Sequence, residues 1–362
     1  MKIPELISFF QLEYPELVSD MKGANHHLTA NDQIKLEVPE SFMCVRINGD
    51  NIIESINPYH NESDVFTHTM MVCKQAENAP YEVQIAALLH DIGKPSTRAV
   101  NPKNGRVSFF NHDAVSAFMS LEILKREELG LTKRQQTRIF NMIALHTQIY
   151  KLNEQQLADI GDRQLITNLR LLGKADHAGR FHTAGDAEIS PLVYITSKMK
   201  DYKKCKKEKE VIILCGLPGS GKSRWTHNNA YNRDTGKLSM IVSRDHYFAE
   251  HFPDLDYNNA WKQTNQKLVD RWLVQKFAYA KRQDQVIVDM THMSKKSRRK
   301  SLSHFGSEYK KKCVVFLPDM PTLFLQNENR SGKVIGREVI EKMMRSFYPP
   351  TMEEFDEIEY VI

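Results

Sequence analysis

The chain has 362 residues, 41% of them hydrophobic and 26% charged, and a formal net charge of only +5, which excludes a disordered chain and leaves room for two globular domains. No apolar run approaches the roughly 18 residues that cross a bilayer, and the N-terminal residues show no cleavage signal, so we expect neither a membrane span nor a signal peptide. The five cysteines are scattered and odd in number, which argues against a disulfide framework or a structural zinc site and favours a reducing, cytoplasmic compartment.

The N-terminal half of the chain is predicted to be helical. Residues 1–56 mix apolar and polar residues with several turn signals, and their role is not evident from the sequence. From about residue 64 onward apolar residues recur at helical spacing, and no alternation typical of a strand appears before residue 195. We therefore expect an all-α domain over residues 57–205.

The predicted helices carry an ordered set of metal-binding residue types. The set, with each position on its own helical stretch apart from one adjacent pair, is His68, His90, Asp91, His112, His146 and Asp176. Imidazole and carboxylate together suit divalent transition metals such as Mn²⁺, Ni²⁺ or Co²⁺, and helices of a bundle can direct them to one centre. One such histidine alone is more often a core or surface residue, but the ordered set predicts a catalytic metal site for phosphoester hydrolysis. Lys94 would neutralise a phosphate oxygen of the substrate there.

The strings around these residues, ALLHDIGKPST, NHDAVSA, IALH and KADHAGR, stand in the order found in HD-superfamily phosphohydrolases, which residues 57–182 resemble. The resemblance implies two metal ions. The first would be held by His68, His90, Asp91 and Asp176, and Asp91 would bridge to a second held by His112 and His146. Four neighbours are interpreted as supporting residues: His60, Asp113, His177 and His182. His26 and His27 lie outside the motif and receive no role.

A lysine-rich stretch, residues 198–209, precedes a segment of different character and is interpreted as a linker. Short β-branched runs then alternate with helical stretches, at VIILC, MIVS, QVIVD and CVVF. This alternation predicts an α/β domain with a parallel sheet over residues 206–362. A second basic stretch, residues 295–312, fits a solvated helix and a phosphate-facing surface equally well.

The first of these strands is followed by GLPGSGKS, which fits the phosphate-binding pattern G-x-x-x-x-G-K-[ST]. The residues expected to shape the loop are Gly216, Gly219, Ser220 and Gly221. Their backbone N–H groups would turn toward the phosphates, while Lys222 reaches the β- and γ-phosphates and the Ser223 hydroxyl holds Mg²⁺. Because a strand precedes the motif and a helix follows it, we expect ATP or GTP with Mg²⁺ as the cofactor.

Polar residues end the next two strands. Asp245 is placed to act as the base for an acceptor hydroxyl. Four residues are candidates to contact the acceptor: Arg244, Asp289, Thr291 and Arg298. Near the C-terminus, NRSGKVIG is typical of a basic lid, in which Arg330 or Lys333 would stabilise the transferring phosphate.

Residues 210–350 resemble the polynucleotide 5′-hydroxyl kinases in GLPGSGKS, in SRDHY, in DMTH and in the arginine ahead of VIGREVI. The resemblance implies Asp245 as general base, Arg330 as lid arginine, and Lys222 and Ser223 as ligands of the NTP and Mg²⁺. Such kinases often carry an arginine three residues beyond the base, where this chain has Phe248. Arg244 or Arg298 would then replace it, or the acceptor is not a polynucleotide.

An HD domain followed by such a kinase is the order of the bifunctional HD–polynucleotide kinase end-healing enzymes. The resemblance implies phosphorylation of 5′-OH ends of RNA or DNA and removal of 2′,3′-cyclic or 2′/3′-terminal phosphates. A separate ligase would complete the repair, since no K-x-D-G signature is present. Two alternatives stay open: a nucleoside or nucleotide kinase fused to a nucleotidase, and a regulatory P-loop NTPase switch. The preferred NTP, the choice between RNA and DNA and the oligomeric state are not indicated.

Overall fold

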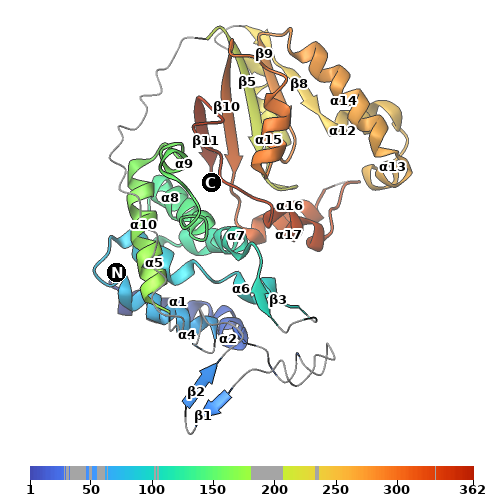
Figure 1. The fold of residues 1–362 in the computed structure, drawn as a ribbon. Coiled ribbons are helices and arrows are strands. Elements are labelled where there is room, and N and C mark those ends of the chain that lie inside the picture. The colour runs from blue at the N-terminus through green and yellow to red at the C-terminus, as the bar shows by residue number, and fades with distance from the viewer. Residues whose placement is uncertain are drawn as a thin grey trace. The chain divides into compact units, whose positions relative to one another are not determined.

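The computed structural model describes residues 1–27, 29, 32, 46–48, 51–54, 62, 64–101, 103, 106–180, 207–232, 236–330 and 332–362. His60, His182 and the linker up to residue 206 lie outside the described residues. The chain divides into two compact units, one of Met1–Leu157 with Asp162–Thr196 and one of Ala158–Gly161 with Ser197–Ile362 (Figure 1). Of the helices in the described ranges, none has both the length and the apolar character that a bilayer crossing requires.

The first unit is a bundle of helices, as the sequence predicts. Its main members are α4 (Val65–Gln75), α5 (Tyr81–Leu89), α7 (His112–Leu124), α8 (Lys133–Leu145) and α10 (Arg163–Ala178). These helices pack against one another, α7 on α8 and α5 on α4, α8 and α10. Their shared core is apolar and fully buried, with Leu88, Phe118, Phe140 and Leu169 at most 2% exposed. Shorter helical pieces are α6 (Lys94–Thr97), η2 (Glu127–Leu129) and α9 (Glu154–Ala158).

The described N-terminal helices belong to this same unit. α1 (Ile3–Glu13) and α2 (Pro15–Gly23) each begin with a proline in the first turn, where a missing N–H costs no helical hydrogen bond. Phe10 and Met21 are fully buried, and the two helices contact α5, α4 and α6. Part of the segment without a predicted role therefore completes the bundle.

Two small antiparallel pairs were not predicted. They are β1 (Arg46–Asn48) with β2 (Asn51–Glu54), and β3 (Arg98–Val100) with β4 (Val107–Phe109). Strands of three or four residues are too short to show an alternating pattern in the sequence, which is why the pattern indicated helices alone.

The second unit contains a five-stranded sheet whose strands are all parallel, which confirms the predicted α/β fold. The strand order is β11 (Glu357–Val361), β10 (Tyr309–Phe316), β5 (Lys209–Cys215), β9 (Gln285–Asp289) and β8 (Met240–Ser243). The last five residues of β5 are buried without alternation, as expected for a strand covered on both faces. A short antiparallel pair, β6 (Tyr231–Asn232) with β7 (Lys237–Leu238), stands apart from the sheet.

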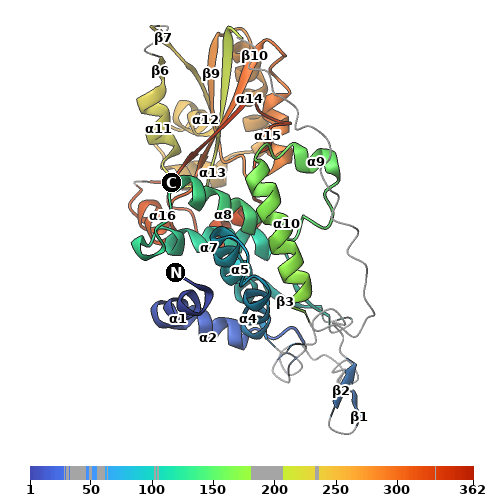
Figure 2. The same cartoon turned by 90° about the vertical axis from the view of Figure 1, so that its left-hand side faces the viewer.

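Within the described residues of this unit, seven helices connect and cover these strands. They are α11 (Lys222–Asn229), α12 (Arg244–His251), α13 (Tyr257–Gln263), α14 (Gln266–Ala280), α15 (Lys295–Leu302), α16 (Met320–Glu328) and α17 (Arg337–Met344). Figure 2 shows α11 to the left and α15 to the right of the strands. Because the strands are parallel, the carboxyl ends of β5, β9 and β8 meet at one edge, where ligands bind in open α/β sheets.

Candidate active sites

In the helical unit, three histidines at helix ends turn the same nitrogen inward. His90 and His146 directly follow α5 and α8, and His112 begins α7. Each Nδ1 lies within hydrogen-bond distance of the carbonyl oxygen three residues earlier: His90 on Ala87 (2.8 Å), His112 on Phe109 (2.7 Å) and His146 on Ile143 (2.7 Å). A carbonyl only accepts, so each Nδ1 carries the proton and each Nε2 keeps its lone pair for a metal.

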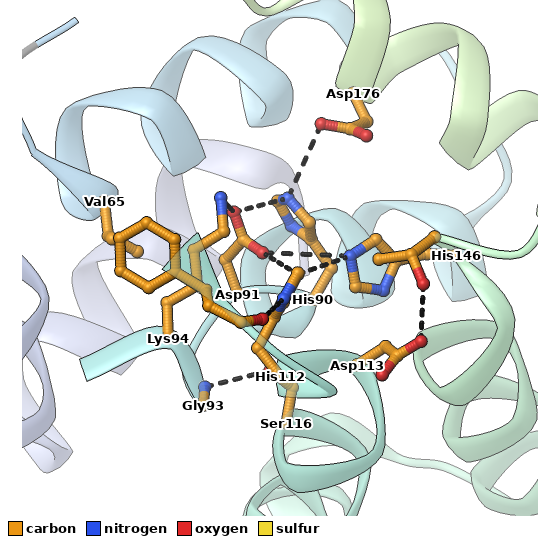
Figure 3. A network of polar contacts seen from close by, with 12 residues as sticks. Val65, His90, Asp91, Gly93, Lys94, His112, Asp113, Ser116, His146 and Asp176 are labelled. Atoms are coloured by element: carbon orange, nitrogen blue, oxygen red, sulfur yellow. Dashed lines mark hydrogen bonds and ion pairs between the residues drawn. The ribbon is translucent and has the colours of Figure 1, made fainter. Parts of the chain in front are cut away.

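These lone pairs converge on one carboxylate. His90 Nε2 lies 3.1 Å from Asp91 Oδ2, and His112 Nε2 lies 3.1 Å from Asp91 Oδ1 (Figure 3). Two groups of donor atoms, each within 4.8 Å of one another, have the spacing of a metal site: His68, His90 and Asp91, and Asp91, His112 and His146. Asp176 Oδ1 joins the first group, 3.1 Å from His68 Nε2. The six residues expected to bind metal thus lie together, with Asp91 shared.

The burial of this cluster fits a cation. Asp91 and His90 are at most 1% exposed. Lys94 Nζ pairs with Asp91 Oδ2 at 2.7 Å, but hydrogen bonds within the described residues satisfy neither Asp91 Oδ1 nor His90 Nε2. Buried polar atoms in that condition are uncommon and costly, and metal coordination satisfies them. Mixed imidazole and carboxylate donors suit divalent transition metals.

The charge states in the cluster are those that ligands need. Burial and the neighbouring His112 and His90 lower the pKa of His146 to about 4, so it is neutral at physiological pH. Burial alone would raise the pKa of Asp91, but His90 and Lys94 outweigh it and hold that pKa well below its usual range. Lys94 Nζ supplies the nearest positive charge, 2.7 Å from Asp91 Oδ2.

Residues that the motif leaves out complete this site. Glu62 Oε1 lies 3.1 Å from His68 Nδ1, so it fixes the ring with Nε2 toward the metal position. His26 is fully buried, packs edge-to-face on His68, and its Nε2 accepts from Lys94 Nζ at 3.4 Å. Arg180 pairs with the Asp176 carboxylate. Only His26 is distant from the motif and carries no sequence signal for such a role, whereas Glu62 and Arg180 lie within residues 57–182, close to His68 and Asp176 in the sequence.

Asp113, interpreted as a supporting residue, is buried beside the cluster. Its carboxylate accepts from the Thr147 hydroxyl and, at 3.5 Å, from Gln148, the two residues that follow His146. It therefore holds the chain just beyond α8 against the first turn of α7.

In the α/β unit, the phosphate loop joins the central strand β5 to α11. Gly219 and Gly221 have φ angles of 82° and 92°, a region that side chains other than glycine rarely adopt. A Cβ on Gly216 would lie 2.6 Å from the Ser220 hydroxyl oxygen, so this position is also closed to larger residues. The predicted glycines therefore have a steric reason to be there.

Lys222 folds back over the loop. Its Nζ donates to the carbonyl oxygens of Gly216 (2.9 Å) and Leu217 (2.7 Å). Burial, with nearby Lys333 and Arg330, lowers the pKa of Lys222 to about 8. A phosphate near this ammonium would stabilise its charged form.

A cavity of about 530 Å³ lies over the loop. The predicted residues that line it are Gly219, Ser220, Gly221, Lys222, Ser223, Arg244, Asp245, Asp289, Thr291, Arg330 and Lys333. The register Ser243 to Asp289 places the ends of β8 and β9 side by side at its wall. Lys333, from the segment between α16 and α17, contacts the Asp245 carboxylate. The residues expected to bind the nucleotide, to act as base and to form the lid thus line one cavity.

Arg298 was expected to contact the acceptor, and the structure places it elsewhere. Its guanidinium is fully buried and forms a two-point ion pair with Glu354, Nε to Oε1 at 3.1 Å and Nη2 to Oε2 at 2.8 Å. It also donates to the carbonyl oxygen of Tyr348 at 2.8 Å. Arg298 therefore ties α15 to residues 348–354 and is a structural residue. The basic pattern of residues 295–312 could not show that this side chain faces inward.

Comparison with known families finds one matching domain in each unit. Residues 64–178 match the HD domain, and residues 211–350 match an AAA domain (AAA_33). The chain joins an HD phosphohydrolase domain to a P-loop kinase-like domain.

Two curated relatives match this chain over short stretches. Over 70 residues, 18% of this chain and 16% of the relative, it is 41% identical to the A-adding tRNA nucleotidyltransferase of Deinococcus radiodurans. Over 39 residues, 11% of this chain and 9% of the relative, it is 51% identical to the CC-adding tRNA nucleotidyltransferase of Thermus thermophilus. The chain thus spans less than a fifth of the length of these curated relatives. Among solved structures, a gluconokinase from Sinorhizobium meliloti 1021 is 15% identical with a TM-score of 0.29, covering 43% of this chain and 83% of that chain.

Proposed function

We propose that this protein heals broken nucleic-acid ends. The kinase-like domain would phosphorylate a 5′-OH end with an NTP, and the HD domain would remove a 2′,3′-cyclic or 2′/3′-terminal phosphate. The proposal rests on the observation that the Asp245 carboxylate lines the same cavity as the phosphate loop. An NTPase switch has no use for a base aimed at an acceptor, whereas a phosphotransferase needs one.

The kinase chemistry follows from the residues around the cavity. Asp245 would take the proton of the acceptor hydroxyl as its oxygen attacks the γ-phosphorus and the bond to the β-phosphate oxygen breaks. Lys222 and Arg330 would neutralise the charge on the transferring group and the leaving diphosphate. Lys333 pairs with Asp245 in this structure and would have to release it, or exchange it for phosphate, when the acceptor binds.

In the HD domain, divalent metal bound by the two His/Asp groups would polarise a phosphate oxygen and activate water. Lys94 lies beside Asp91 and would hold a second phosphate oxygen. Glu62 and His26 would keep His68 and Lys94 in position. Both curated relatives are named as tRNA nucleotidyltransferases, which favours RNA as the substrate of this chain.

One substrate tests both halves. An RNA oligonucleotide with a 5′-OH and a 2′,3′-cyclic phosphate is incubated with ATP or GTP, Mg²⁺ and Mn²⁺, and both termini are followed by mass spectrometry. We expect a gain of one phosphate at the 5′ end and opening or loss of the 3′ block. Ligation of the products by an added RNA ligase would show that the healed ends can be sealed. NTP consumption with neither terminus changed, or phosphorylation of a free nucleoside alone, would refute the proposal.

A further inference from the structure

Phe248 stands where the similar kinases often carry an arginine for the acceptor phosphate. In the structure this side chain is only 3% exposed. Its ring packs against Tyr257 and Trp261, with centroids 4.9 Å and 5.6 Å away. Phe248 is therefore unable to contact an acceptor itself, and it supports two aromatic rings instead.

Those two rings form one wall of the nucleotide cavity. Tyr257 and Trp261 are one turn apart on α13, and their rings are stacked, 6.0 Å between centroids and 29° between planes. Both line the cavity beside Arg244 and Asp245, and Trp261 is 38% exposed. We call this pair, Tyr257 and Trp261, the aromatic wall.

Charged contacts tie the aromatic wall to the acceptor side of the cavity. The Arg244 guanidinium lies 5.6 Å from the centre of the Trp261 ring, and Arg244 directly precedes Asp245. Lys333 Nζ lies 3.9 Å from the centre of the Tyr257 ring and also contacts the Asp245 carboxylate. Trp261 thus lies beside Arg244, the chain neighbour of Asp245, and Tyr257 lies beside Lys333, which contacts Asp245. The 5′-terminal nucleotide of an acceptor has to lie next to Asp245, the expected general base.

We propose that the aromatic wall binds the nucleobase of the acceptor's 5′-terminal nucleotide by stacking. This inference rests on the proposed 5′-kinase activity and adds the feature of the acceptor that the enzyme reads. Every base has a flat face, so stacking selects a nucleotide end over other alcohols without selecting a sequence. Arg244 and Lys333, which lie over the ring faces in this structure, would move aside when a nucleobase stacks there, and their positive charges would then favour an anionic strand.

Steady-state kinetics on matched 5′-OH oligonucleotides tests the proposal. One carries a normal 5′-terminal nucleotide and the other an abasic sugar at that position, so that the hydroxyl is the same. Stacking contributes about 1–3 kcal/mol per base, so we expect the acceptor KM to rise roughly 5- to 150-fold for the abasic end. Trp261→Ala should raise the acceptor KM for the normal end by a similar factor, add little for the abasic end, and leave the KM for ATP unchanged.

Trp272→Ala is the matched control. Trp272 is also partly exposed in the same domain, but its indole donates to Glu250 at 3.1 Å and it does not line the cavity. We expect wild-type acceptor KM from this variant. Since the chain has three tryptophans, Trp225→Phe with Trp272→Phe leaves Trp261 as the only one, and its fluorescence should be quenched by the normal oligonucleotide and not by the abasic one.

The possible results separate the two proposals. Equal acceptor KM for normal and abasic ends, with phosphorylation intact, would overturn the aromatic wall alone. A Trp261→Ala variant whose KM rises for ATP and not for the acceptor would assign the wall to the NTP base and also overturn it. No phosphorylation of any 5′-OH oligonucleotide by the wild type would overturn the proposed function together with this inference.

Discussion

Replacing Arg298 with alanine should unfold the kinase-like domain at a much lower temperature. The substitution removes a fully buried guanidinium and leaves the Glu354 carboxylate, whose side chain is 2% exposed, without its ion-pair partner. It also removes the donor that Tyr348 O accepts at 2.8 Å. Breaking one side of a buried ion pair costs about 3–5 kcal/mol, because the remaining charge stays desolvated.

That cost converts into a measurable shift. For a domain of this size, 1 kcal/mol moves the midpoint by about 2–4 °C, so the expected decrease in Tm is roughly 6–20 °C. Two compact units need not unfold together, so calorimetry should be combined with hydrogen exchange, which assigns the shifted transition to the amides of β5 and β10.

Arg299→Ala provides the comparison. Arg299 is the next residue along, its side chain is 58% exposed, and it pairs with Glu353 at 3.0 Å. An exposed pair of this kind contributes at most about 1 kcal/mol, so its Tm should change by a few degrees or less. An Arg298→Ala protein with wild-type Tm and a raised acceptor KM would show that Arg298 contacts the acceptor and that its buried pair does not stabilise the domain.

Three further outcomes are expected. Asp91→Asn should abolish metal binding, measured by elemental analysis, and 3′-phosphate removal, while 5′-phosphorylation persists; loss of both activities in a folded protein would contradict two separate sites. The pKa of Lys222 is lowered to about 8 from its ordinary 10.5, so the free energy of unfolding of the nucleotide-free domain should increase as the pH rises from 8 to 10.5. NTP binding near pH 8 should be accompanied by proton uptake, because the phosphates stabilise the charged form of Lys222. Calorimetric titrations in buffers of different ionisation enthalpy measure that uptake, which Lys222→Met should remove. Gly93→Ala would place a Cβ 2.6 Å from the backbone N of Ser116, costing about 1–3 kcal/mol and weakening metal affinity, whereas Gly23→Ala, with nothing within 4 Å of its Cβ, should change neither.

The sequence predicts those parts of the two sites whose chemistry requires particular residue types at fixed positions along the chain. The phosphate loop is contiguous, and its glycines are required by φ angles and close approach, so GLPGSGKS identifies it directly. The residues expected to bind metal are spread over separate helical stretches, apart from the adjacent pair His90 and Asp91, but they stand in a fixed order. The α/β fold follows from the alternation of strands and helices.

What the sequence does not predict depends on which way a side chain faces. Arg298 lies among exposed basic residues and only packing turns it inward to Glu354. His26 comes about 40 residues before the first ligand, and tertiary contacts alone bring it to Lys94. The aromatic wall could not be predicted either, because α13 carries no motif and only the folded structure shows that its two rings line the cavity with Asp245.

The position of β5 in the middle of its sheet affects the order in which the two sites can form during synthesis. All six residues of the candidate metal site have been synthesised by Asp176, so the helical site can assemble early. β5 carries the phosphate loop, but its two neighbours are β9 and β10, and Tyr309, the partner of Lys209, comes about 100 residues after it. At typical ribosomal rates of about 5–20 residues per second, β10 is synthesised roughly 5–20 s after β5. A stalled or truncated nascent chain would therefore carry a folded HD domain while the phosphate loop still lacks the strands that support it.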